Sequence, residues 1–122
     1  MAKILIVDDS SIIRVTLRAI LENAGHEIVG EAQDGLAGYD LYFQLKPDII
    51  ITDLTMPLLD GITAIHKIRE KDSAAKIMLV TSNTNTEKIK EAVIAGVTEI
   101  LFKPVNESQL IRSIDQIMQR EK

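Results

Sequence analysis

Short β-branched, aliphatic runs alternate along this 122-residue chain with longer stretches in which apolar residues recur at helical spacing. Short apolar runs rich in Ile and Val are typical of strands, and recurrence every three or four residues is typical of amphipathic helices. Strands that alternate with helices pair in parallel through right-handed crossovers. The alternation therefore restricts the chain to an α/β fold built from five strand–helix units.

The expected strands differ in how apolar they are. The runs at 3–7, 49–53 and 76–81 are nearly continuous, as in strands with helices on both faces, whereas 27–32 is partly polar and reads as an edge. The prediction is a single domain over residues 1–122, a doubly wound parallel sheet with helices on both faces. The fifth strand is expected at 99–102, and the helices at 11–24, 36–45, 61–70, 86–95 and from 107 onward, the first with Ile13, Leu17, Ile20 and Ala24 inward.

Four of these runs end in side chains that can react or bind a cation. The carboxyl ends of parallel strands share one edge of the sheet, and ligands of open α/β sheets bind outside that edge. The sequence thus predicts three carboxylates, one hydroxyl and one ammonium close together. They are Asp8, Asp9, Asp53, Thr81 and Lys103.

This set of side chains suits a magnesium ion and a phosphoryl group. Carboxylates that crowd together repel one another, and Mg²⁺, which prefers oxygen ligands, relieves that repulsion. Asp53 stands alone before a loop and is the expected nucleophile, whose attack on phosphorus would give an acyl phosphate. Asp8 and Asp9 are expected to hold the metal. Thr81 would donate to the phosphoryl group, and Lys103 would pair with Asp53 or with a phosphoryl oxygen.

Composition narrows the function classes further. The net charge of −4 and the pI of about 5.1 argue against nucleic-acid binding by this domain, which needs a basic face. The apolar runs are far shorter than a membrane span. Without cysteine, disulfides and Cys-based zinc sites are excluded, and the cytoplasm is the expected compartment. His26 and His66 lie far from the acidic cluster in the sequence, which argues against a zinc site there.

Each motif also has a purely structural explanation. Asp8 and Asp9 could cap the helix that follows them, and Asp53 or Thr81 could be turn residues. Caps and turns give no reason, however, for acids after two strands, a hydroxyl after the next and Lys103 after the last. The joint pattern favours the chemical explanation.

The motifs together resemble the receiver domain of two-component response regulators, of the stand-alone chemotaxis-regulator kind. They are Ile4-Leu-Ile-Val-Asp-Asp9, Asp53-Leu-Thr-Met-Pro-Leu-Leu-Asp-Gly61, Val80-Thr-Ser82 and Phe102-Lys-Pro104. The resemblance covers essentially the whole chain and implies a flavodoxin-like strand order 2-1-3-4-5. It implies a cytoplasmic switch, not an enzyme acting on an external substrate.

The resemblance also implies roles for individual residues. Asp53 would be the phosphoacceptor, and its donor a phosphohistidine on a sensor histidine kinase or histidine phosphotransfer protein, or acetyl phosphate. Asp9, Asp53 and the backbone carbonyl of Thr55 would bind Mg²⁺ directly, with Asp8 acting through water. A cis peptide bond is implied between Lys103 and Pro104.

Departures and unassigned residues concern the output and the donor. Many receivers carry an aromatic three residues before the lysine, whereas this chain has Ile100, which cannot donate a hydrogen bond. The expected output face is the surface of the fourth helix, fifth strand and fifth helix, toward a protein target that the sequence does not name. Ile12 lies off the apolar stripe and is predicted to be exposed, either as a chance surface residue or as part of a docking site for the donor, with Pro104 opposite.

Other functions fit less well. A phosphatase with an Asp nucleophile needs a second Asp two residues later, where this chain has Thr55. A dinucleotide-binding domain or a P-loop needs a glycine-rich phosphate loop, which does not follow the first strand. Within the receiver family, a phosphorelay intermediate and the excised receiver of a larger transcriptional regulator remain as alternatives.

Overall fold

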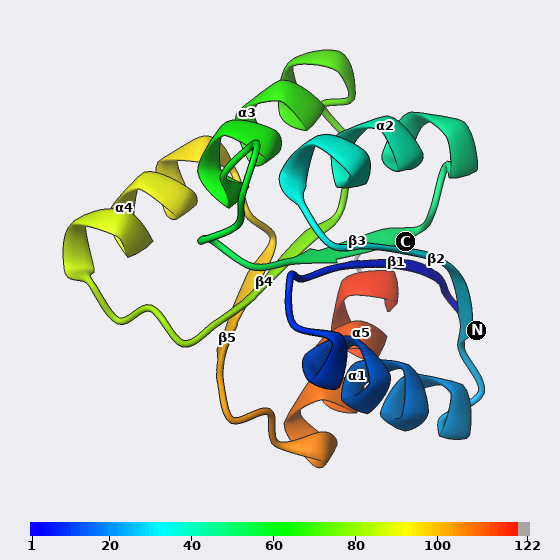
Figure 1. Ribbon diagram of the computed structural model, residues 1–122. Helices are drawn as coiled ribbons and strands as arrows, with labels where there is room; N and C mark the ends of the chain where they lie inside the picture. The colour runs from blue at the N-terminus through cyan, green and yellow to red at the C-terminus, as the bar shows by residue number, and fades with distance from the viewer. Residues whose placement is uncertain (120–122) are drawn as a thin grey trace.

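The computed structural model describes residues 1–119, which form five strands and five helices in strict alternation (Figure 1). The elements are β1 Lys3–Val7, α1 Ser11–Asn23, β2 Glu27–Ala32, α2 Gly35–Leu45, β3 Ile49–Thr52, α3 Gly61–Lys71, β4 Ile77–Thr81, α4 Thr86–Ala95, β5 Glu99–Phe102 and α5 Glu107–Gln119.

The strands form one parallel sheet in the order β2-β1-β3-β4-β5, which confirms the predicted topology and the edge position of β2. Two strand bounds were predicted one residue too long. Asp53 lies just after β3, and Lys76 lies just before β4. The chain order reverses between β1 and β3, so the carboxyl ends of these two strands flank the point where ligands bind in such sheets.

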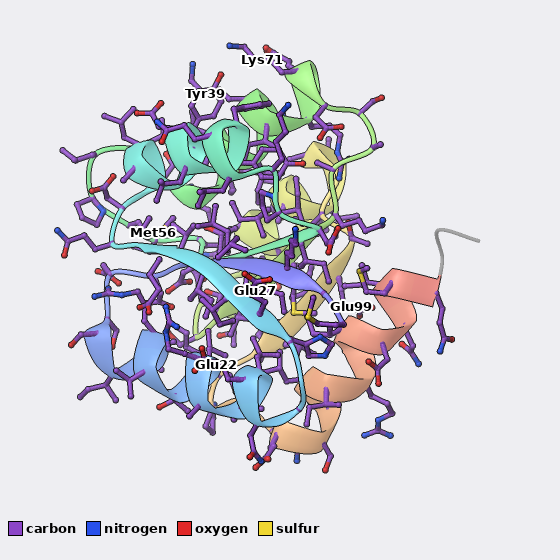
Figure 2. The ribbon with its side chains drawn as sticks, turned by 90° about the vertical axis from the view of Figure 1, so that its right-hand side faces the viewer. Glu22, Glu27, Tyr39, Met56, Lys71 and Glu99 are labelled. Carbon is purple, nitrogen blue, oxygen red and sulfur yellow. The ribbon has the colours of Figure 1, made fainter. Side chains whose placement is uncertain are left out.

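Helices cover both faces of the sheet. In Figure 1, α2, α3 and α4 lie on one side and α1 and α5 on the other. Alternate residues of β1 show why: Leu5 and Val7 belong to the core under α2–α4, whereas Ile4 and Ile6 belong to the core under α1 and α5. Figure 2, in which β2 faces the viewer, shows the sheet between these two layers. Each fully buried aliphatic side chain contributes about 1.5–3 kcal/mol, so the two cores fix the strands that carry the site.

Helix α1 buries a stripe that differs from the prediction at one position. Leu17 and Leu21 are buried, with Ile13 and Ile20 packed beside them, whereas Ala24 is exposed. Ala24 is the C-cap, where the chain leaves the helical path, and the larger Leu21 one turn earlier fills the space against the sheet instead.

The loop between β3 and α3 is held by two glycines that leave no room for a side chain. A Cβ atom on Gly61 would lie 2.0 Å from the carbonyl oxygen of Asp53, and one on Gly35 would lie 1.8 Å from that of Leu59. The amide of Gly61 also donates to the Leu54 carbonyl at 2.7 Å. Asp53 therefore stands on backbone that is packed closely against the start of α3.

Candidate functional site

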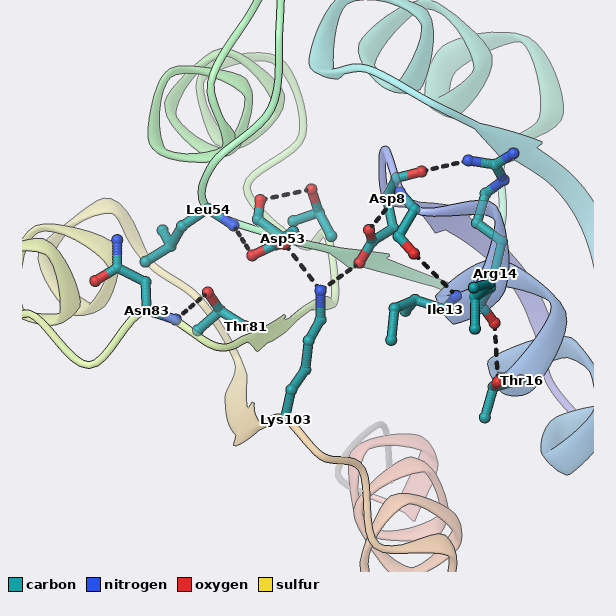
Figure 3. Close-up of polar contacts among 12 residues, drawn as sticks. Asp8, Ile13, Arg14, Thr16, Asp53, Leu54, Thr81, Asn83 and Lys103 are labelled. Atoms are coloured by element: carbon teal, nitrogen blue, oxygen red, sulfur yellow. Dashed lines mark hydrogen bonds and ion pairs between the residues drawn. The ribbon is translucent and has the colours of Figure 1, made fainter.

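Residues that follow three different strands meet at the carboxyl edge of the sheet. Asp8 follows β1, Asp53 follows β3 and Lys103 follows β5. Figure 3 shows the Lys103 side chain reaching between the two carboxylates. The parallel register explains this meeting, because Val7 pairs with Thr52, the residue just before Asp53.

Lys103 makes an ion pair with both acids. Its Nζ donates to Asp8 Oδ2 at 2.8 Å and to Asp53 Oδ2 at 2.9 Å. The three side chains are 14%, 3% and 10% exposed respectively, so water screens these pairs only weakly. Burial alone lowers the pKa of Lys103, but its hydrogen bonds to Asp8 and Asp53 outweigh burial and raise the pKa above its ordinary value. Lys103 is a fixed positive charge at neutral pH.

Asp53 is held by backbone as well as by Lys103. Its Oδ1 accepts from the Leu54 amide at 2.7 Å, and the residue is buried. Both carboxylate oxygens of Asp53 are therefore engaged, Oδ1 by the Leu54 amide and Oδ2 by Lys103, and these two bonds fix the orientation of the side chain. A carboxylate oxygen can accept more than one hydrogen bond, so both oxygens keep a lone pair for another group.

Three carboxylates lie close enough to share one cation. Ligand oxygens of Asp8, Asp9 and Asp53 all lie within 4.8 Å of one another. Asp8 is buried and its Oδ1 accepts from the Ser10 amide at 2.9 Å, whereas Asp9 is exposed. A set of oxygen donors with one open, solvated member fits Mg²⁺, which keeps several waters when it binds to protein. Thr55, which would supply a carbonyl ligand, lies exposed in the loop after Asp53.

Thr81 is the last residue of β4, is buried, and pairs with Phe102 of β5, the residue before Lys103. Its carbonyl accepts from the Lys103 amide at 2.8 Å, which ties β4 to the start of the β5–α5 loop. The hydroxyl oxygen accepts from the Asn83 amide at 3.0 Å, so its own proton remains to be donated to another group. Asn83, which is half-buried, in turn accepts from the amide of Asn85, the N-cap of α4. The hydroxyl is thus linked by two short turns to the start of α4.

The remaining predicted residues lie outside this cluster. Ile100 is half-buried and packs against the core under α2–α4. Ile12 is 76% exposed at the start of α1, as predicted, and Pro104 is exposed after a cis Lys103–Pro104 bond. Neither Ile12 nor Pro104 is part of the acidic cluster, so their connection with a donor remains a prediction.

One polar residue at the site was missed by the sequence interpretation. Arg14, in the first turns of α1, donates through Nη1 to the carbonyl oxygen of Asp8 at 2.6 Å. Its Nε donates to Glu31 on β2 at 3.2 Å. An arginine near the start of an amphipathic helix was the available signal in the sequence. Its partner on β2 lies 17 residues away, however, and spacing alone does not reveal such a contact.

An apolar groove of about 450 Å³ runs between α4 and β5. Its apolar lining includes Ile94, which is 82% exposed, and Phe102, which is 47% exposed, together with Ile89 and Val93. The Phe102 ring, one residue before Lys103, thus points outward.

Among residues 1–119, no helix has the length and apolar character needed to cross a bilayer.

Comparison with known proteins gives a consistent family. The model of the "response regulator receiver domain" matches residues 4–115. Protein CcdB of Bacillus subtilis is 36% identical over 97% of this chain and 98% of its own. Chemotaxis protein CheY of Thermotoga maritima is 36% identical over 94% of this chain and 96% of its own. Among solved structures, the CheX–CheY–BeF3–Mg²⁺ complex from Borrelia burgdorferi has a TM-score of 0.90 with 28% identity, covering 95% of this chain and 88% of that one.

Proposed function

This chain belongs to the response regulator receiver family, a family of phosphorylation-activated switches of two-component systems, and we propose that it takes its phosphoryl group on Asp53. The observation that carries this proposal is the pair of bonds from Lys103 to Asp8 and Asp53. These bonds keep the positively charged ammonium of Lys103 beside Asp53, the proposed nucleophile, and beside Asp8, one of the acids that would hold a metal. Phosphoryl transfer needs such positioning and charge neutralisation more than it needs covalent help from the protein.

The proposed step is an in-line displacement at phosphorus. An oxygen of Asp53 forms the new O–P bond while the N–P bond of a phosphohistidine breaks, and the donor imidazole keeps the electron pair and takes up a proton. Lys103 would follow the negative charge from the carboxylate to a phosphoryl oxygen, a role supported by its contact with Asp53 at 2.9 Å. Thr81 would donate its hydroxyl proton to a second phosphoryl oxygen.

We propose the metal ligands that the resemblance to the receiver family implies. Asp9 and Asp53 would bind Mg²⁺ directly, with the carbonyl of Thr55 as a third protein ligand. Asp8 already accepts from Lys103 and from the Ser10 amide, which suits a role through water. When bound, the ion supplies positive charge for the phosphoryl oxygens during transfer. The support for Mg²⁺ is the set of carboxylate oxygens within 4.8 Å of one another, and the presence of Mg²⁺ with a CheY in the complex from Borrelia burgdorferi.

We propose that the output surface lies over α4, β5 and α5. A phosphoryl group adds nearly two negative charges, toward which the Thr81 hydroxyl would turn. That movement would break its bond to the Asn83 amide and alter the turn that begins α4. The groove between α4 and β5 would change shape as a result. Because Ile100 is aliphatic and packs inward, the change would not involve a hydrogen bond from that position.

We further propose the partners and the compartment. The donor would be a sensor histidine kinase or a histidine phosphotransfer protein, and the target a protein that binds the α4–β5–α5 face. The phosphohistidine of such donors is made from ATP, so we assign the exchange to the cytoplasm. No external substrate would be turned over, because Thr55 stands where a phosphatase with an Asp nucleophile has its acid.

Intact mass spectrometry tests the proposal. The protein is incubated with MgCl₂ and acetyl phosphate, and the expected product carries one phosphoryl group that is stable to acid and lost in base. Asp53→Asn should give no adduct, and EDTA should suppress the adduct on the parent protein. An adduct that forms on Asp53→Asn to the same yield would assign the acceptor to another residue. No adduct on the parent protein with acetyl phosphate or a phosphohistidine donor would overturn the proposal.

A further inference from the structure

A guanidinium group holds the backbone next to the acidic cluster. Arg14 Nη1 donates to the carbonyl oxygen of Asp8 at 2.6 Å, a contact that Figure 3 shows on the side of Asp8 away from Lys103. The Arg14 side chain is 17% exposed, so water competes weakly for this bond. A hydrogen bond from a charged donor is roughly twice as strong as a neutral one.

That carbonyl belongs to the peptide unit that joins Asp8 to Asp9. A peptide unit is planar, so an atom that fixes the Asp8 carbonyl also fixes the direction in which the chain continues to the Cα atom of Asp9. The other polar atoms of Asp8 have partners of their own, with its amide bonded to Ala32 O at 3.0 Å. Asp9 is exposed. The orientation of Asp9 therefore depends on the peptide unit that Arg14 holds.

Arg14 is itself oriented by a carboxylate on the neighbouring strand. Glu31 accepts from Arg14 Nε at 3.2 Å through one oxygen and from Arg18 Nε at 2.7 Å through the other. Arg14 and Arg18 are one helical turn apart, and both tie α1 to β2 through the same partner. Only Arg14 also contacts the Asp8 backbone, whereas Arg18 makes its second contact with Glu22 at 3.0 Å. The two arginines therefore form a matched pair that differs in its link to the site.

We propose that Arg14, oriented by Glu31, is a positioning residue for the magnesium site, and that it acts by holding the Asp8–Asp9 peptide unit so that Asp9 faces Asp53. This inference rests on the magnesium site of the proposed function. It assigns to α1 and β2 a part in metal binding, although neither element supplies a ligand. Residues that orient metal ligands typically change metal affinity by about 10–100-fold when they are replaced.

Magnesium binding by the matched variants tests the inference. The affinity for MgCl₂ alone is measured by isothermal titration calorimetry for the parent protein, Arg14→Met and Arg18→Met, without any phosphodonor. Arg14→Met is expected to weaken binding about ten-fold, at the lower end of the range for orienting residues. Arg18→Met is expected to stay within about two-fold of the parent, because it removes only the tether to Glu31 and Glu22.

A spectroscopic readout in the metal-free protein separates positioning from stability. In ¹⁵N-labelled protein with EDTA, Arg14→Met should shift or broaden the amide signal of Asp9, and Arg18→Met should leave it in place. Arg14→Lys provides a second variant if Arg14→Met does not fold. Its single ammonium group can replace one of the two contacts of the guanidinium but not both, so its magnesium affinity should fall between those of the parent and Arg14→Met.

The outcomes are distinct. Equal weakening of magnesium binding by Arg14→Met and Arg18→Met would reduce Arg14 to a tether between α1 and β2 and overturn the inference. Parent-like affinity in Arg14→Met would overturn it as well. If the parent protein itself does not bind Mg²⁺, the proposed metal site fails and this inference fails with it, which differs from a parent that binds with unaffected variants.

Discussion

Replacing Lys103 by methionine should destabilise the protein far more than the loss of an ordinary surface lysine. The substitution keeps most of the aliphatic stem but removes the ammonium that contacts two acids at 2.8 and 2.9 Å. Removing one partner of a buried ion pair typically costs about 3–5 kcal/mol because the remaining charge is left uncompensated. The site opens to water at one edge, so we take the lower end, about 3 kcal/mol.

Urea unfolding in EDTA measures this cost. With a slope of about 1.5 kcal/mol/M, a loss of about 3 kcal/mol lowers the midpoint by about 2 M. Lys90→Met is the matched control, because Lys90 Nζ lies 3.8 Å from Glu87 and these side chains are 66% and 80% exposed. A pair this exposed contributes about 0.5 kcal/mol or less, so the midpoint should change little.

A double variant tests the electrostatic reasoning itself. Lys103→Met leaves Asp8 and Asp53 as uncompensated neighbours, so adding Asp53→Asn removes one of the two charges. The double variant should therefore be more stable than Lys103→Met alone, by about 1 kcal/mol or more. The reasoning is refuted if Lys103→Met loses no more stability than Lys90→Met, or if Asp53→Asn adds to the loss instead of reducing it.

Three further predictions concern other parts of the chain. Burial lowers the pKa of His26, whose Nδ1 accepts from the Ala2 amide at 2.9 Å. The folded state therefore favours the neutral ring, and unfolding free energy measured in urea should fall as the pH drops below about 6.5, with a smaller fall in His26→Gln. Leu58 has a φ of 69°, which favours glycine, and its side chain is 80% exposed. Leu58→Gly should therefore stabilise the fold by about 0.5 kcal/mol and raise the thermal midpoint, and a lowered midpoint would contradict this. Gly61→Ala should cost about 2 kcal/mol or more in urea unfolding, because its Cβ would lie 2.0 Å from the Asp53 carbonyl oxygen, and a parent-like midpoint would show that the loop can yield.

The sheet could be predicted because its information is local. Four of the five strands are short apolar runs, and the order of strands and helical stretches fixes the crossovers. The strand ends with Asp8, Asp53 and Lys103 therefore fell at one edge as expected. The inward stripe of α1 was less certain, because Leu21 and Ala24 both fit a helical period and only packing against the sheet decides between them.

The contacts of the charged groups at the site were not predictable in the same way. The sequence indicated that Lys103 could pair with Asp53, but not that it contacts Asp8 as well, since this depends on the distance between two strand ends. The link from Arg14 to the Asp8 carbonyl involves backbone, which no residue pattern encodes. Long polar side chains can reach many partners, and the fold selects among them.

The double contact of Lys103 has a consequence for how the site is loaded. Without metal, the single ammonium of Lys103 contacts two of the three carboxylates, so the cluster is assembled before any ion enters and keeps a net negative charge for an incoming cation. A magnesium ion at the proposed site would add to this partial compensation and would compete with Lys103 for the carboxylate of Asp53. Such competition would free the ammonium of Lys103 from a carboxylate at the stage when the incoming phosphoryl oxygens need a counter-charge.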